Sequence, residues 1–386
     1  MSGIWSSLLD SASSAKSVPT RTLLLIGGTA QCQRDFINQL VQSVNNDLYA
    51  IQGSYSAVKN DYAIGYLYID VYDREQEELI IRLHIYTVSK LHESYANLLV
   101  NILNREETTF ESLFVTILCD WTEPRRWIRD IAQTILFLRN DVISKIDQEK
   151  FSGGLARCSE RYNKLANTSF TDSFQLLAGN SSTIEVPLGK GEFDAPLGIQ
   201  FMVAVMNSER TEVLERQFGR KDDEFDFIQQ FLRTILLKHG ASLIYLSSDS
   251  KTLFPLLFYL LSPSITVEHS RDYLKEAAQF VKPNVIQRDA VLIPSGWDSW
   301  SKILVIKEDF DVEGVSSSWQ SEVLAEDGDV DALIEVFEEV VHAFGAAVSS
   351  TKEVQKAAAA LEVESVPTQQ FLRECLAELS SVELNE

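Results

Sequence analysis

The residues 21–34, RTLLLIGGTAQCQR, come closest in type and spacing to a chemical function. An apolar run precedes two glycines and an amphipathic segment, which is the order of strand, turn and helix that binds phosphate in nucleotide hydrolases. Such a turn has the sequence G-x-x-x-x-G-K-[ST]. Its backbone N–H groups surround the phosphates, its lysine reaches the outer phosphates, and its hydroxyl holds magnesium.

The side chains that carry this chemistry are replaced here. When the template begins at Gly27, Cys32 takes the place of the second glycine, Gln33 that of the lysine, and Arg34 that of the hydroxyl residue. The Cβ of a cysteine crowds a turn that needs positive φ, a glutamine carries no charge, and an arginine does not ligate a cation. We therefore predict a degenerate phosphate-binding turn, with no catalytic residue, metal or cofactor.

The two other sites of a GTPase are also degraded. The hydrolytic motif D-x-x-G is expected after a hairpin near residue 88, where the chain reads Ser89-Lys90-Leu91-His92. The base-reading motif N-K-x-D is expected after an apolar run that ends at Met206. The sequence there is MNSE, in which only Glu209 has a carboxylate for a guanine edge. An atypical GTPase, with its charge supplied by Arg34 or Lys190, is the alternative.

Apolar runs and helical periodicity predict the elements that position this turn. After the first strand we expect strands over 64–72, 79–88, 113–119, 198–206 and 241–247, and helices over 36–44, 91–102, 124–146, 225–235 and 253–261. This order predicts an α/β fold of the GTPase (P-loop NTPase) type. Its sheet is mostly parallel with one antiparallel edge, has helices on both faces, and is followed by a C-terminal helical extension.

The charge distribution divides the chain. Residues 308–386 contain 19 acidic and 3 basic residues and carry most of the net charge of −22. We expect a flexible segment over 1–20, a GTPase-like domain over 21–307 with an insertion around 151–196, an acidic extension with an amphipathic helix over 308–365, and a short final helix over 366–386. An acidic extension disfavours nucleic acid and anionic membranes as partners. We also expect no direct membrane insertion, because no apolar run approaches a membrane span.

Three smaller features have simpler explanations than a site. The four cysteines are scattered along the chain, which indicates reduced thiols in a cytoplasmic protein. Cys119 lies within an apolar strand, where we expect its thiol to be a buried packing group. A basic patch on the third predicted helix is expected to be a solvated face; it consists of Arg125, Arg126 and Arg129. Near the N-terminus four apolar residues have helical spacing and could dock on a partner or on the domain, although weakly docked disorder is favoured; they are Ile4, Trp5, Leu8 and Leu9.

Several motifs together carry a family resemblance. They are LLLIGG with its degenerate turn, YLYIDVYD at 66–73, DFIQQFLR at 226–233, ASLIYLSS at 241–248, RDAVLIPSGWD at 288–298 and EVLAEDGDVDAL at 322–333. Their order and spacing resemble the cytoplasmic dynein light intermediate chain family, with a fungal member as the expected source. The similarity runs from about residue 20 to residue 333, which is most of the chain.

The resemblance implies a non-catalytic subunit of the dynein motor. In that family a GTPase-like domain attaches to the heavy-chain tail, and short C-terminal helices bind coiled-coil cargo adaptors for transport toward microtubule minus ends. The expected location is therefore cytoplasmic, with microtubules reached only through the motor. The nearest match to the adaptor-binding helix has one apolar face, formed by Phe371, Leu372, Cys375, Leu376 and Leu379. A helix that folds back on the domain, or an interaction module of another assembly, is the alternative.

Overall fold

The computed structural model describes most of the chain before residue 343. The described residues are 20–44, 48–53, 64–74, 77, 79–88, 90–104, 112–146, 148–166, 188–248, 251–261, 282–325 and 328–342. Packing divides the chain into one compact unit over Met1–Ala346 and a second over Ala347–Glu386. The second unit, with the predicted final helix, lies outside the described residues, and the predicted domain boundaries remain predictions.

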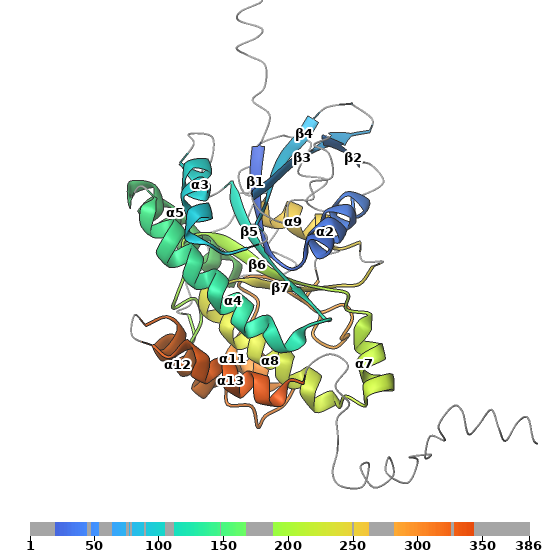
Figure 1. Ribbon diagram of the computed structural model, residues 1–386, viewed down its shortest axis with the longest axis vertical. Coiled ribbons are helices and arrows are strands. Elements are labelled where there is room, and N and C mark those ends of the chain that lie inside the picture. The colour runs from blue at the N-terminus through green and yellow to red at the C-terminus, as the bar shows by residue number, and fades with distance from the viewer. Residues whose placement is uncertain are drawn as a thin grey trace, which may run out of the picture. The chain divides into compact units, whose positions relative to one another are not determined.

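One eight-stranded sheet organises the first unit, in the order β2-β3-β4-β1-β5-β6-β7-β8 (Figure 1). The strands are β1 Thr20–Gly27, β2 Leu48–Gly53, β3 Ile64–Asp73, β4 Leu79–Val88, β5 Leu113–Asp120, β6 Gln200–Met206, β7 Ser242–Leu246 and β8 Leu292–Ile293. β4, β1, β5, β6 and β7 are parallel, and β2 and β3 form the antiparallel edge. At the other edge, β8 pairs antiparallel with β7. The predicted α/β fold of GTPase type is confirmed.

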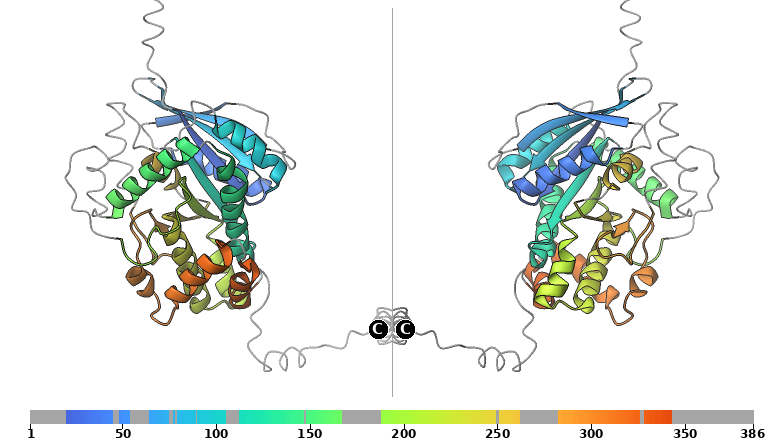
Figure 2. Two further views of the ribbon diagram at one scale, coloured as in Figure 1. Left: turned by 90° about the vertical axis from the view of Figure 1, so that its left-hand side faces the viewer. Right: turned by 90° about the vertical axis from the view of Figure 1, so that its right-hand side faces the viewer.

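Helices cover both faces of this sheet, as the two side views show (Figure 2). The principal ones are α2 Ala30–Gln42, α3 Glu93–Leu103, α4 Trp127–Leu136, α5 Gln148–Ala166, α7 Arg210–Phe218, α8 Asp222–His239, α9 Leu253–Leu261, α11 Trp300–Leu304, α12 Val312–Ser318 and α13 Val330–Val340. α2 and α9 pack on one face of the sheet, whereas α3, α4 and α8 pack on the other. The two hydrophobic cores lie between these layers.

Local sequence explains where the elements begin and end. β5 is buried along Leu113–Cys119, as expected for a parallel strand with helices on both faces. Thr29 caps α2 by accepting from the backbone N–H of Cys32, and Asp329 caps α13 in the same way from Asp331. α8 ends at Gly240, whose φ of 66° is the left-handed conformation that glycine adopts without strain.

The observed elements differ from the sequence-based expectation in several places. β2, α7, α11 and α12 were not predicted, and neither was β8, which adds a second antiparallel edge to the sheet. The helix expected over 124–146 changes type along its length, from a 3₁₀ turn over Pro124–Arg126 to α4, a π-helical segment over Phe137–Val142 and a second 3₁₀ turn over Ile143–Lys145. A π turn depends on where neighbouring side chains pack, so periodicity alone does not reveal it.

The basic patch on this helix is only partly a solvated face, contrary to prediction. Arg129 donates to Asp331 at 2.7 Å and to Glu338 at 3.0 Å, and both carboxylates belong to α13. Arg125 lies 3.7 Å from the same Glu338. The acidic residues of α13 therefore bind two of the three arginines of α4 and its entry turn.

Candidate functional site

The turn after β1 is too short to surround a phosphate. β1 ends at Gly27 and α2 begins at Ala30, so only Gly28 and Thr29 connect them. In a phosphate-binding loop the helix begins only at the second glycine of the motif, which corresponds to Cys32. Here Cys32 is already in the first turn of α2. The backbone N–H of Cys32 donates to the Thr29 hydroxyl at 3.2 Å and that of Gln33 to the Thr29 carbonyl at 3.0 Å, so these two groups are already engaged within the chain.

Gln33 occupies the place of the lysine and folds back onto the strands. Its Nε2 donates to the carbonyl of Gly27 at 2.9 Å and to that of Val88 at 3.2 Å. The side chain is 5% exposed and bridges the carboxyl ends of β1 and β4. Where a lysine would extend toward a ligand, this carboxamide ties two strands together.

Cys32 and Arg34 are not arranged to bind an anion. Cys32 is buried, and a Cβ added to Gly28 would lie 3.0 Å from its Sγ. Burial raises the pKa of the Cys32 thiol to about 12, and the negative charge of Asp120 adds to the effect. Arg34 donates through Nη2 to the side chain of Gln31 at 2.8 Å, on the surface of α2.

Polar side chains near the carboxyl ends of the neighbouring strands also form hydrogen bonds within the protein. This edge is where parallel α/β sheets bind ligands. Asp120 accepts from the Asn207 amide at 2.8 Å, and Gln39 of α2 donates to the carbonyl of Ser247 at 2.8 Å. Glu209, the one candidate for a guanine edge, accepts from the backbone N–H of Ser248 at 3.3 Å. The groups that could read a nucleotide are thus engaged by the protein.

Neither a reactive cysteine nor a group of metal ligands is found at this edge in the described part of the chain. Cys119 is buried in β5, and burial raises the pKa of its thiol well above the usual range, as expected for a packing residue. Among the described residues, no three histidine, cysteine or acidic side chains are grouped to hold a metal ion. No helix in the described ranges has the length and apolar character to cross a membrane.

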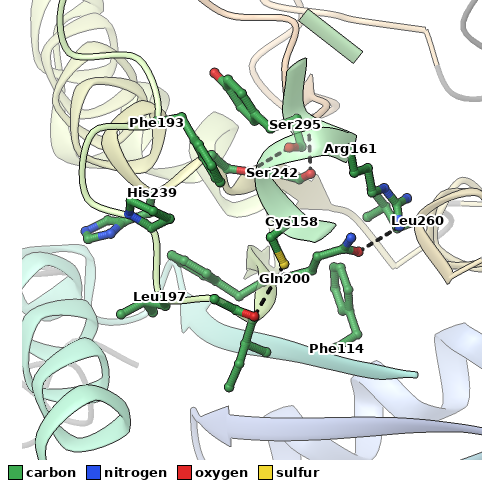
Figure 3. Close-up of a pocket in the computed structure, with 16 residues that line it drawn as sticks. Phe114, Cys158, Arg161, Phe193, Leu197, Gln200, His239, Ser242, Leu260 and Ser295 are labelled. Atoms are coloured by element: carbon green, nitrogen blue, oxygen red, sulfur yellow. Dashed lines mark hydrogen bonds between the residues drawn. The ribbon is translucent and has the colours of Figure 1, made fainter. Parts of the chain in front are cut away.

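Two cavities lie at the opposite, amino-terminal edge of the sheet. The first is lined by Gln200 and Ser242, the first residues of β6 and β7 (Figure 3). Its volume of about 30 Å³ leaves room for about one water molecule. The adjoining cavity is about 520 Å³ and has Arg139, Asp194 and Gln320 among the residues that line it. Neither cavity involves the Gly27 turn.

His239 joins the two cavities and was not singled out by sequence reasoning. Its Nε2 accepts from the indole N–H of Trp319 at 2.9 Å. Because an indole nitrogen only donates, the proton of the neutral imidazole is on Nδ1, which donates to the carbonyl of Ala195 at 2.6 Å. Burial lowers the pKa of His239 to about 4. Nothing in its sequence context distinguishes it from an exposed histidine at a helix end.

Two of the motifs that carry the family resemblance bind each other. Arg233 forms two hydrogen bonds with Asp298, at 2.7 and 2.6 Å, and both side chains are buried. Arg288 donates to Asp222 at 2.7 Å and lies 4.0 Å from Asp226. The motif at 226–233 is therefore fastened at both ends to the motif at 288–298.

The fold and its modified turn place this chain in the class of α/β domains of the P-loop GTPase type. A family model described as "Dynein light intermediate chain (DLIC)" matches residues 2–326. The chain belongs to the dynein light intermediate chain family. A solved structure, titled as that of the Dynein Light Intermediate Chain's Conserved Domain, is similar with a TM-score of 0.67 and 31% identity. The match covers 84% of this chain and 99% of that one.

Curated relatives carry the same family name. Cytoplasmic dynein 1 light intermediate chain 1 of Dictyostelium discoideum is 31% identical over 128 residues, covering 33% of this chain and 24% of the relative. The protein of that name from Mus musculus is 22% identical over 330 residues, covering 82% of this chain and 58% of the relative. The matched region is thus little more than half of the mouse relative. The predicted adaptor-binding residues lie outside the described part of the chain.

Proposed function

We propose that the chain is a non-catalytic subunit of the cytoplasmic dynein motor. In this role it binds the heavy-chain tail and links the motor to coiled-coil cargo adaptors for transport toward microtubule minus ends. The family match over residues 2–326 is the observation that carries the proposal. The proposed location is the cytoplasm, on microtubules through the motor.

We infer that the GTPase-like domain is a scaffold. The Gln33 carboxamide on the carbonyls of Gly27 and Val88 supports this role, since it occupies the place of the phosphate-binding lysine. An atypical GTPase would need another cation at the turn. Lys190 precedes β6 at the amino-terminal edge of the sheet, 81% exposed and 4.0 Å from Glu313, so it does not meet that need.

Nucleotide content tests the scaffold role directly. Purified protein is denatured, and the supernatant is assayed for GDP, GTP and ATP, while native protein is titrated with magnesium and GTP in a calorimeter. We expect neither release nor binding. Stoichiometric nucleotide, or heat of binding abolished by Gln33→Ala, would favour the atypical GTPase.

The predicted helix over 366–386 is the proposed adaptor site. We propose that it places Phe371, Leu372, Cys375, Leu376 and Leu379 in a groove of the adaptor. In a binding assay with the full chain and an adaptor coiled coil, Phe371→Ala with Leu376→Ala should reduce affinity by at least tenfold. Gln370→Ala, on the other side of the same helix, is the matched control. Unchanged affinity of the double variant would remove this assignment.

Heavy-chain attachment is tested separately. Co-expression with a heavy-chain tail fragment should yield a complex that survives size-exclusion chromatography, and the Phe371→Ala/Leu376→Ala variant should form it equally well. Failure to co-purify with the tail would favour an interaction module of another assembly.

A further inference from the structure

One face of the antiparallel edge of the sheet is built from tyrosines. Side chains of β2, β3 and β4 that share this face alternate with those that enter the core. We call it the tyrosine face, and it consists of Tyr49, Ile51, Tyr66, Tyr68, Asp70, Tyr72, Arg82, His84 and Tyr86. The tyrosines are partly exposed, and Ile51 is 50% exposed.

Contacts across the strands fix these side chains in place. The rings of Tyr49 and Tyr72 stack at 5.2 Å, and those of Tyr66 and Tyr86 lie 5.0 Å apart. The ring of Tyr68 covers Gly53, where an added Cβ would be 2.0 Å from the ring. A fixed aromatic surface loses little conformational entropy when it binds, which makes tyrosine a frequent interface residue.

A bidentate ion pair lies at the centre of this face. Arg82 of β4 donates to both carboxylate oxygens of Asp70 at 2.7 Å, and its guanidinium lies 5.2 Å from the centre of the Tyr68 ring. The pair satisfies the two charges within the face. The surface therefore combines aromatic area with little unpaired charge, which suits an apolar binding partner.

In the described part of the chain, the helices on the same side of the sheet as the tyrosine face pack mainly on the parallel strands and not on β2, β3 and β4. α3, α4 and α8 bury residues of β1, β5, β6 and β7, and of the three antiparallel-edge strands only Val88 is buried in that core, with Ile64 and Tyr86 at its margin. The reverse face of the same strands is filled by α2 and its neighbours, which bury Ile69, Val71 and Leu83. Figure 1 shows β2, β3 and β4 projecting beyond α3.

The described chain begins beside this face. Thr20, the first residue of β1, is in register with Arg82. The nineteen residues before it include four apolar residues at helical spacing, at positions 4, 5, 8 and 9. An extended chain spans about 3.3–3.6 Å per residue, so the residues between Leu9 and Thr20 can reach across the face, which is roughly 20 Å long from Tyr72 to Tyr66. The family match also includes this segment from residue 2 onward.

We propose that residues 1–19 dock on the tyrosine face of their own domain, through Ile4, Trp5, Leu8 and Leu9. A helix this short is unstable in water, and packing its apolar residues against a fixed aromatic surface supplies the missing stabilisation. The docked segment covers the exposed Ile51 and completes the helical layer on this side of the sheet.

Hydroxyl-radical footprinting of the full chain tests the proposal, because it measures the solvent exposure of individual side chains. Wild type is compared with a variant carrying Ile4→Ser, Trp5→Ser, Leu8→Ser and Leu9→Ser. We expect oxidation of Tyr68, Tyr72 and Ile51 to rise severalfold in the variant, whereas the buried Tyr245 stays unchanged as an internal reference. Ser6→Ala with Ser7→Ala, on the other side of the same helical turn, should leave the wild-type pattern.

In the reciprocal experiment the substitutions are made in the tyrosine face, and the oxidation of the N-terminal segment is measured. Ile51→Asp with Tyr68→Ser should raise the oxidation of Trp5, provided that thermal unfolding shows the variant to be folded. Equal oxidation of the tyrosine face in wild type and the four-serine variant would overturn the proposal. If the tyrosine face loses its protection from oxidation on dilution, it binds a second copy of the chain. If it is protected only when a heavy-chain tail fragment is added, it binds that partner. Either result overturns docking on the same domain.

Discussion

His239 should make the stability of the domain depend on pH in a defined window. Its imidazole is buried, neutral and bonded to Trp319 and Ala195. Burial lowers the pKa of His239 from 6.5 to about 4, and the neighbouring Lys238 acts in the same direction. Between these two values the unfolded chain binds a proton that the folded chain does not. The free energy of unfolding therefore falls as the pH falls from the ordinary pKa to the folded one.

The size of this effect follows from the two pKa values. One pKa unit corresponds to about 1.4 kcal/mol, so lowering the pH from about 7 to about 5 should cost about 2 kcal/mol of stability through this residue. At about pH 4 the loss should reach about 3 kcal/mol, and it should level off below that. Protonation also removes the acceptor for the Trp319 indole, so the segment that carries this tryptophan loses a hydrogen bond.

Urea unfolding of wild type and His239→Gln at several pH values isolates this contribution. The glutamine does not titrate in this range, so wild type should lose about 2 kcal/mol more than the variant between about pH 7 and pH 5. His342→Gln is the matched control, since that imidazole is 43% exposed, and it should keep the wild-type loss. Parallel loss of stability in wild type and His239→Gln would refute the reasoning.

Two further predictions concern buried polar groups. Gln33→Leu leaves the carbonyls of Gly27 and Val88 without their donor, and it should lower the free energy of unfolding by about 1–3 kcal/mol in urea titration; no loss would mean that the bridge does not stabilise the turn. Arg233→Met leaves Asp298 as an uncompensated buried charge and should cost about 3–5 kcal/mol. Adding Asp298→Leu should recover much of that loss, and strict additivity of the two substitutions would contradict the pairing.

Much of the fold could be predicted because its signals are local. The parallel strands are buried on both faces and read as continuous apolar runs, which is why 113–119 and 241–247 were found almost to the residue. β2 was missed because it is an edge strand whose sequence, LYAIQG, is short and half-exposed. α7 was missed because its nine residues carry only two buried side chains, Thr211 and Leu214.

The sequence predicted which phosphate-binding side chains are missing from the candidate site, but it did not predict the contacts that the substituted residues make. Motif matching found that Cys32, Gln33 and Arg34 lack the chemistry of a phosphate turn. It did not reveal that α2 begins early, or that the Gln33 carboxamide bonds to Val88, 55 residues away. Contacts of that range depend on how the strands pair. The same limit applies to Arg129 of α4, whose two partners are about 200 residues distant.

α13 is also a mechanical element. Phe337 is fully buried, with the rings of Phe227 and Phe231 at 6.0 and 5.1 Å, and Arg129 fastens the helix at Asp331 and Glu338. The chain beyond residue 342 joins the domain through this helix. Tension on that tail would therefore reach the domain first through α13, which is held by the aromatic cluster and the two ion pairs. The packing of α13 would then determine how firmly the tail is attached to the domain.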